Sequence, residues 1–129
     1  MPLVRIDVIE GRTALELRKL ADTLHECIVQ AFSVPERDRF QIITEHRSDH
    51  MIIHDVGLGF ERSAKVVVLQ ITTTPRSLTA RKAFYRLAAE KLHQDCDLSP
   101  DDLMVNFVVT SESDWSFGRG AAQFLTGAL

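Results

Sequence analysis

The sequence predicts an α/β protein in which two helices cover one face of a four-stranded sheet. Short segments with alternating apolar residues predict strands, and two longer segments have apolar residues at helical spacing. The order strand, helix, strand occurs twice, and Arg76 follows Arg12 by 64 positions while Pro100 follows Pro35 by 65. We therefore expect a single domain of two tandem β-α-β units, spanning about 1–63 and 64–129.

The first unit has clear start and stop signals. Its elements are expected as a strand at 4–10, a helix at 14–32, a turn at 34–39 and a strand at 40–44. The helix has a broad apolar stripe on one face. Thr13 is the expected N-cap, and Glu16 completes a capping box because it stands three positions later.

The second unit repeats this order. Its elements are expected as a strand at 65–72, a break at 75–77, a helix through 80–92, a turn at 99–101 and a strand at 103–110. A long helix that connects two strands crosses over the sheet, so the two strands of each unit should be parallel.

The remaining segments are a linker and a tail. The linker, 46–63, is expected to be a loop with a short strand around 51–53, and the tail, 114–129, is expected to form a hairpin that reaches a neighbouring subunit. With both helices on one face, the other sheet face should stay apolar and uncovered, through Val4, Ile6 and Val8 or their alternates. Such a face predicts oligomerisation.

Composition excludes several classes of protein. The 129 residues carry a net charge of −3, whereas a nucleic-acid-binding protein normally has a basic excess. No segment approaches the ~20 apolar residues of a membrane-spanning helix, and the first residues lack the pattern of a signal peptide. The two cysteines, Cys27 and Cys96, have no CxxC spacing. We expect reduced thiols in a cytoplasmic protein, with a disulfide or a catalytic thiol as alternatives.

Pro2 is the first candidate for chemistry. Methionine aminopeptidase removes an initiator Met that precedes a small residue, which would leave Pro2 as a free secondary amine. An α-amino group titrates at about 7.7–8.0, so it can act as an acid or a base near neutral pH. Burial would favour the base, and a neighbouring carboxylate would favour the acid. The alternative is that Pro2 only promotes removal of Met1 and begins a strand.

The chain resembles the tautomerase superfamily, and within it is more similar to the malonate semialdehyde decarboxylase family. The segments that carry the resemblance are Pro2-Leu3, Ile9-Glu10-Gly11-Arg12-Thr13, Asp38-Arg39-Phe40-Gln41-Ile42, Met51-Ile52-Ile53, Gly57-Leu58-Gly59-Phe60-Glu61-Arg62-Ser63, Thr72-Thr73-Thr74-Pro75-Arg76-Ser77, Asp114-Trp115-Ser116-Phe117-Gly118 and Gln123-Phe124-Leu125-Thr126-Gly127. They span essentially the whole chain. The resemblance implies a catalytic amino-terminal proline and a homotrimer.

The resemblance also implies roles for single residues. Pro2 matches the catalytic amine, Asp38 its acidic partner, and Arg76 one of two arginines that bind the substrate carboxylate. Thr74 stands where the family pattern has the other arginine, which leaves the substrate open. An apolar wall is implied at Trp115, Phe117, Phe124 and Leu129. Without the resemblance, these residues would be interpreted as a turn carboxylate, a surface arginine and core aromatics.

The implied activity needs no cofactor and acts on a small oxo carboxylate. Protonated Pro2 would support decarboxylation of a 3-oxo acid such as malonate semialdehyde, and neutral Pro2 would support keto–enol tautomerisation of a 2-oxo acid. Both require removal of Met1.

Two hypotheses from other classes remain. His46, His50 and His54 recur at a spacing of four, which on a helix could ligate a metal, although this segment is poor helix material. A non-enzymatic trimeric binding protein is the second. No motif points to a nucleotide, flavin or pyridoxal cofactor, because Gly57 and Gly59 lack the third glycine of a dinucleotide-binding loop.

Overall fold

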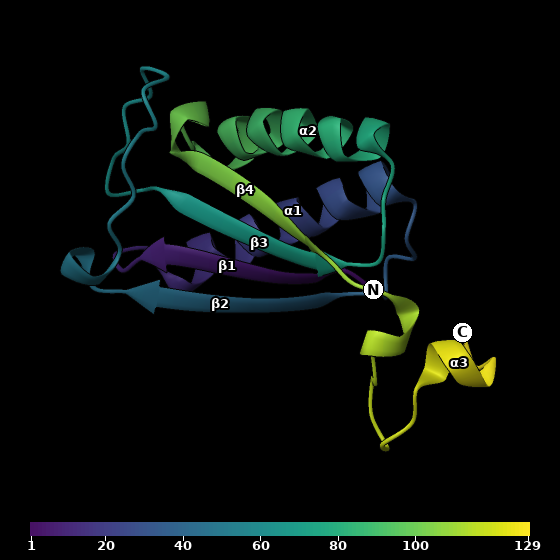
Figure 1. Cartoon of the computed structure of the whole chain (residues 1–129). Helices are drawn as coiled ribbons and strands as arrows, with labels where there is room; N and C mark the ends of the chain where they lie inside the picture. Colours follow the sequence, from purple (N-terminus) through teal and green to yellow (C-terminus); the bar gives the residue numbers. More distant parts are fainter.

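The computed structural model describes residues 1–129 and contains one mixed sheet with the strand order β2-β1-β3-β4 (Figure 1). The strands are β1 (Leu3–Ile9), β2 (Phe40–His46), β3 (Val67–Thr73) and β4 (Leu103–Val109). β1 is parallel to β2, and β3 is parallel to β4, which confirms the parallel pairs expected within each unit. The two central strands, β1 and β3, are antiparallel, so the second β-α-β unit runs opposite to the first.

Two long helices, α1 (Ala14–Phe32) and α2 (Leu78–Cys96), lie on the same face of the sheet (Figure 1). The bounds of α1 and its capping box are as predicted, with the Thr13 side chain accepting from the Glu16 N–H at 3.2 Å. α2 is longer than expected because the Ser77 hydroxyl caps its first turn. Neither helix is long and apolar enough to cross a membrane.

The core lies between the sheet and the two helices. Val4, Ile6 and Val8 of β1 are buried in it, as are alternate residues of β3. The largest side chains with no exposure are those of Ile6, Leu24, Leu69, Ile71, Phe84 and Leu92. Fully burying a side chain of this size contributes about 1.5–3 kcal/mol, so this layer is the main source of stability.

The opposite sheet face carries the alternate residues, because successive side chains of a strand point to opposite faces. On β1 these are Leu3, Arg5, Asp7 and Ile9. Exposed apolar side chains on the same face include Phe40 and Ile42 of β2 and Met104 and Val108 of β4. The uncovered face is therefore less apolar than expected, and it contains the alternates of Val4, Ile6 and Val8 rather than those residues.

The linker and the tail differ from expectation in detail. Residues 51–53 form no strand, and the only regular structure in the linker is a 3-10 turn at Ser48–His50. The tail contains a single bridge between Gly118 and Ala121 rather than a hairpin, followed by the short helix α3 (Gln123–Thr126). In Figure 1 the tail leaves the end of β4 and lies beside the chain's amino terminus.

Candidate active site

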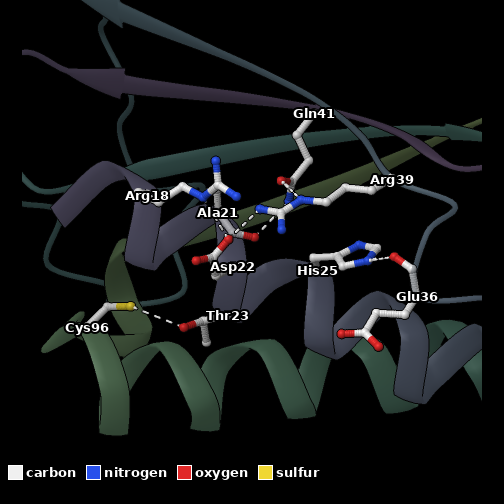
Figure 2. Close-up of polar contacts among 9 residues, drawn as sticks. All are labelled: Arg18, Ala21, Asp22, Thr23, His25, Glu36, Arg39, Gln41 and Cys96. Atoms are coloured by element: carbon white, nitrogen blue, oxygen red, sulfur yellow. Dashed lines mark hydrogen bonds and ion pairs between the residues drawn. The ribbon is translucent and has the colours of Figure 1, made fainter. Parts of the chain in front are cut away.

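The turn between α1 and β2 is firmly attached to α1 (Figure 2). The buried His25 ring donates from Nε2 to the carbonyl oxygen of Glu36 at 2.6 Å. The Arg39 guanidinium donates to the Asp22 carboxylate at 2.6 Å and to Gln41 Oε1 at 2.7 Å. These bonds fix the backbone on both sides of residues 37 and 38, the residues that the turn presents to the amino terminus.

Asp38 lies against the amino terminus of the chain. Its backbone N–H donates to the Pro35 carbonyl oxygen at 2.9 Å, which closes the turn. Its carboxylate forms an ion pair with the Met1 amine, whose residue is buried. Burial lowers the pKa of this amine below that of an ordinary α-amino group, and the Asp38 carboxylate opposes that shift. The structure therefore holds a buried amine against a partly exposed carboxylate.

Pro2 follows Met1 and is fully buried at the start of β1. β1 is a central strand, paired on both sides, so its start is held in place by two neighbours. Pro2 itself precedes the first residue of the ladder, where the missing N–H of proline costs no sheet hydrogen bond.

Arg76 stands between β3 and α2, and its guanidinium is fixed from two sides. Its Nε donates to Thr73 Oγ1 at 3.1 Å, and its Cζ lies 5.6 Å from the centre of the Phe32 ring. Burial lowers the pKa of Arg76, against the opposing effect of Asp38, but an arginine remains charged at neutral pH. Its charge also lowers the pKa of the Met1 amine, which puts Arg76 within electrostatic reach of the chain end.

An aromatic group from the tail faces the same place. Phe117 stacks on Phe40 of β2 at 5.6 Å between ring centres and on Trp115 at 5.6 Å. Phe124 meets Phe117 edge-on at 5.5 Å. A cavity of about 570 Å³ lies between this group and the amino terminus, and it is lined by Met1, Pro35, Arg37, Asp38, Phe40, Phe117, Gln123, Phe124, Ala128 and Leu129.

Hydrogen bonds hold the tail in this position. Gln123 accepts at Oε1 from the Phe117 N–H at 2.9 Å and donates from Nε2 to the Gly118 carbonyl oxygen at 2.9 Å. The Trp115 indole N–H donates to Thr110 Oγ1 at 2.8 Å, just beyond the end of β4. The aromatic wall thus faces the amino terminus of its own chain. Whether the tail also contacts a neighbouring subunit stays a prediction.

Most of the residues singled out from the sequence gather here. Asp38, Phe117, Phe124 and Leu129 line the cavity, and Pro2 adjoins its Met1 edge. Three others lie outside the lining: Arg76, whose charge acts on the Met1 amine, Trp115, which stacks on Phe117, and Thr74, which is half-buried two positions before Arg76.

Sequence reasoning missed the cavity residues Arg37, Phe40 and Gln123, and the supporting residue His25. Arg37 and Phe40 lie within two positions of Asp38, so the turn itself could have indicated them. Gln123 and His25 act through contacts with residues 5 to 11 positions away, which no local pattern predicts.

The histidines of the linker do not lie on a helix. His46 is the last residue of β2 and donates from Nε2 to Asp7 on β1 at 2.6 Å, while His50 and His54 are exposed. No group of three or more His, Cys, Asp or Glu side chains is arranged to hold a metal ion.

The site brings a chain-end amine, a carboxylate and an aromatic cavity together on a sheet of two β-α-β units, and such an amine and carboxylate can perform acid–base chemistry. Family models described as tautomerase enzymes match residues 38–118 and residues 2–61. The chain belongs to the tautomerase superfamily, close to malonate semialdehyde decarboxylase, and is an enzyme of the lyase or isomerase type. This membership favours catalysis over the non-enzymatic binding role.

Individual relatives match over nearly their full length. The chain is 50% identical to "Probable tautomerase YrdN" of Bacillus subtilis (strain 168), with all of both chains covered. A crystal structure of malonate semialdehyde decarboxylase is 45% identical with a TM-score of 0.96 over 98% of each chain. That enzyme was studied as wild type, as a variant with alanine for its first residue, proline, and in inactivated form, for its decarboxylase and hydratase activities. A fused 4-OT trimer, with 16% identity and a TM-score of 0.79 over 97% of this chain and 98% of its own, shares the fold.

Proposed function

We propose that this chain, after removal of Met1, uses the Pro2 nitrogen as an acid–base catalyst on a small oxo carboxylic acid. The preferred reaction is decarboxylation of a 3-oxo acid such as malonate semialdehyde. The observation that carries the proposal is the position of Pro2, which is buried next to the Met1 amine that pairs with Asp38 at the edge of an aromatic cavity. Once Met1 is removed, the new chain end would adjoin this carboxylate. A carboxylate beside an amine favours the protonated amine, which is the form that decarboxylation needs.

The groups have separate tasks in this reaction. Arg76 would bind the substrate carboxylate and hold the breaking C–C bond perpendicular to the carbonyl plane. Protonated Pro2 would donate a hydrogen bond to the carbonyl oxygen, so that this oxygen accepts the electron pair of the broken C–C bond as an enolate. In the covalent alternative, Pro2 would first lose its proton and add to the carbonyl carbon, and loss of water would give an iminium that accepts the pair as an enamine. Addition of water would then release the product and restore Pro2. Phe117 and Phe124 would weaken solvation of the carboxylate as it leaves as carbon dioxide. Protonation of the remaining carbon gives the aldehyde.

Keto–enol tautomerisation of a 2-oxo acid is the second candidate. A relative that is 50% identical is described as a probable tautomerase, and Thr74 replaces one arginine of the decarboxylase pattern. Burial lowers the pKa of the amine at this chain end, which favours the neutral form that a base requires. The two reactions therefore differ in the protonation state of one nitrogen.

We further propose that the chain is a homotrimer of the cytoplasm. Exposed apolar residues on the uncovered sheet face, among them Phe40, Ile42, Met104 and Val108, offer a surface for self-association. Trimers are described for the fused 4-OT structures that share the fold. Both cysteines are free, as expected of a protein in a reducing compartment.

Proton NMR with two substrates tests the proposal: malonate semialdehyde reports decarboxylation, and the enol of phenylpyruvate reports tautomerisation. We expect wild type to convert one of them and Pro2→Ala to lose at least a hundredfold in kcat/KM, because the secondary amine is replaced. Turnover of neither substrate by wild type would reject the proposed chemistry.

The substitution is matched to the processing step. Alanine is also small enough to allow removal of Met1, so both proteins should begin at residue 2. Intact-mass measurement checks this, and circular dichroism with sedimentation velocity checks that fold and assembly are equal. Full activity of a wild-type sample that retains Met1 would contradict the role of Pro2, since its nitrogen would then be an amide.

A further inference from the structure

We propose that Arg37 is a second guanidinium that binds the substrate carboxylate. It would replace the family's other carboxylate-binding arginine, whose position is occupied by Thr74 in this chain. This inference rests on the proposed function, which supplies a carboxylate as the ligand. Arg37 lines the cavity together with Met1 and Asp38, whereas Arg76 lies outside the lining. Of the two arginines, Arg37 is therefore the one that a ligand in the cavity would contact directly.

The guanidinium of Arg37 is not engaged by the protein. Its residue is exposed, and its side chain makes no ion pair and no hydrogen bond within the chain. Its near neighbour Arg39 is committed to Asp22 and Gln41, as Figure 2 shows. Two arginines of one turn thus have different tasks, and only Arg37 has all its donors available for a ligand.

The backbone that carries Arg37 is nevertheless fixed. The Glu36 carbonyl on one side is bonded to His25, and the Asp38 N–H on the other is bonded to Pro35. A fixed backbone with a free side chain brings the guanidinium to the cavity at the cost of ordering one long side chain when a ligand binds. The planar fork of arginine can hold a carboxylate through two parallel hydrogen bonds.

The local charge also favours an anion. Arg76 and Arg37 give two permanently charged cations near one side-chain carboxylate, Asp38, although the whole chain carries −3. Much of the remaining lining is apolar. A positive excess in a cavity with apolar walls attracts an anionic ligand more strongly than the same charges in open water.

Binding of a non-reacting carboxylate tests the proposal without any turnover. The probe is 3-phenylpropanoate, its neutral control is 3-phenylpropanamide, and the signal is the fluorescence of Trp115, the only tryptophan. Arg37→Gln should weaken carboxylate binding by on the order of tenfold to a hundredfold, the value of a charge-assisted hydrogen bond to a carboxylate, and leave amide binding unchanged. Arg37→Lys, which keeps the charge but loses the fork, should fall between wild type and Arg37→Gln.

Arg47→Gln is the matched control, because it removes the same charge from an exposed position after the end of β2, outside the cavity lining. It should bind both probes as wild type does. Four results would each overturn the role of Arg37: wild type does not bind the carboxylate; Arg37→Gln binds it as tightly as wild type; Arg37→Gln loses as much affinity for the amide as for the carboxylate; or Arg47→Gln loses as much carboxylate affinity as Arg37→Gln.

A turnover measurement separates this inference from the proposed function. With the oxo acid that wild type converts, Arg37→Gln should raise KM by a factor similar to the loss of binding and change kcat little, since the contact exists before and during the reaction. If wild type converts no oxo acid while its carboxylate binding still depends on Arg37, the proposed reaction fails and the carboxylate site stands. If wild type converts an oxo acid and Arg37→Gln does so with an unchanged KM, the proposed reaction stands and the role of Arg37 fails.

Discussion

The protonation of one nitrogen decides which chemistry this site can perform. In the chain that begins at Met1, burial and the charge of Arg76 lower the pKa of the terminal amine, and Asp38 opposes that shift. We expect the same three influences to act on the Pro2 nitrogen once Met1 is removed. These influences come from three different segments of the chain, so each can be changed by itself. The carboxylate is the influence that a single substitution removes with the least change in shape.

Asp38→Asn is expected to lower the pKa of the catalytic amine, because an amide no longer stabilises the ammonium form. If protonated Pro2 is the acid, activity falls as pH rises through this pKa, and the variant's decline should move to lower pH. The pH profile of kcat/KM measures the shift. In a tautomerase with neutral Pro2, the rising limb on the acid side should move to lower pH instead. An unmoved profile would show that Asp38 does not act on the amine.

The two thiols should differ sharply in reactivity. Cys27 is fully buried, and burial raises the pKa of its thiol to about 11, whereas Cys96 is half-buried. At pH 8 the native protein should therefore react with 5,5′-dithiobis(2-nitrobenzoate) at Cys96 alone, and the denatured protein at both. Rapid reaction of two thiols in the native state would contradict the burial of Cys27.

The same thiol predicts an alkaline loss of stability. An unfolded cysteine titrates near ~8.5, so between there and about 11 the unfolded chain binds fewer protons than the folded one. Stability should fall as pH rises through this window and be unaffected by Cys27 below it. Cys27→Ala, compared at pH 7 and pH 10 by urea denaturation, should show a smaller alkaline loss than wild type.

At the scale of single elements, the position of the loop that carries Phe117 depends on the Gln123 side chain. Gln123 bonds the N–H of Phe117 and the carbonyl of Gly118, and so closes the loop that carries the aromatic wall. Gln123→Ala should raise KM severalfold and leave the unfolding midpoint within a few degrees of wild type, because the tail lies outside the core.

Helices and strands were largely predictable because their signals are local. The capping box of Thr13 and Glu16 and the alternation of Val4, Ile6 and Val8 each depend on residues within a few positions. The antiparallel pairing of β1 with β3 was not predictable in this way, since it joins residues about 60 positions apart, such as Val8 with Val67. The aromatic wall of the tail was predicted only from the family resemblance. The hydrogen bonds by which Gln123 holds that wall in place were found only in the structure.

At the scale of the whole molecule, the uncovered sheet face should determine assembly. Ile42 lies on this face and is 40% exposed. Ile42→Lys places a charge among apolar neighbours, and it should convert the proposed trimer into smaller species in sedimentation velocity. Leu15→Lys, at an 83% exposed position on α1, is the control and should not change the sedimentation coefficient. Unchanged assembly in both variants would move the interface elsewhere.

The reversed second unit gives the molecule a counterpart of its own reaction centre. Both units have seven-residue strands and a 19-residue helix, and the two helices start 64 positions apart, so Arg12 occupies the place of Arg76. Asp102 acts on the charge of Arg12 as Asp38 acts on that of Arg76. At this opposite end the backbone continues through Lys65, whose carbonyl oxygen accepts a hydrogen bond from the Arg12 guanidinium at 2.7 Å. The Asp102 carboxylate accepts hydrogen bonds from the backbone N–H and the hydroxyl of Ser63. A peptide bond stands where the first unit has an amine.

When two such units are joined in one chain, only the first unit has a free amino terminus, so only one of the two equivalent ends has a reactive amine. A complex of separate units would have a reactive nitrogen at every unit, while the joined chain has one for every two. The stoichiometry follows directly: a mechanism-based inhibitor that alkylates the terminal nitrogen should add one label per polypeptide and three per trimer, as mass spectrometry would show.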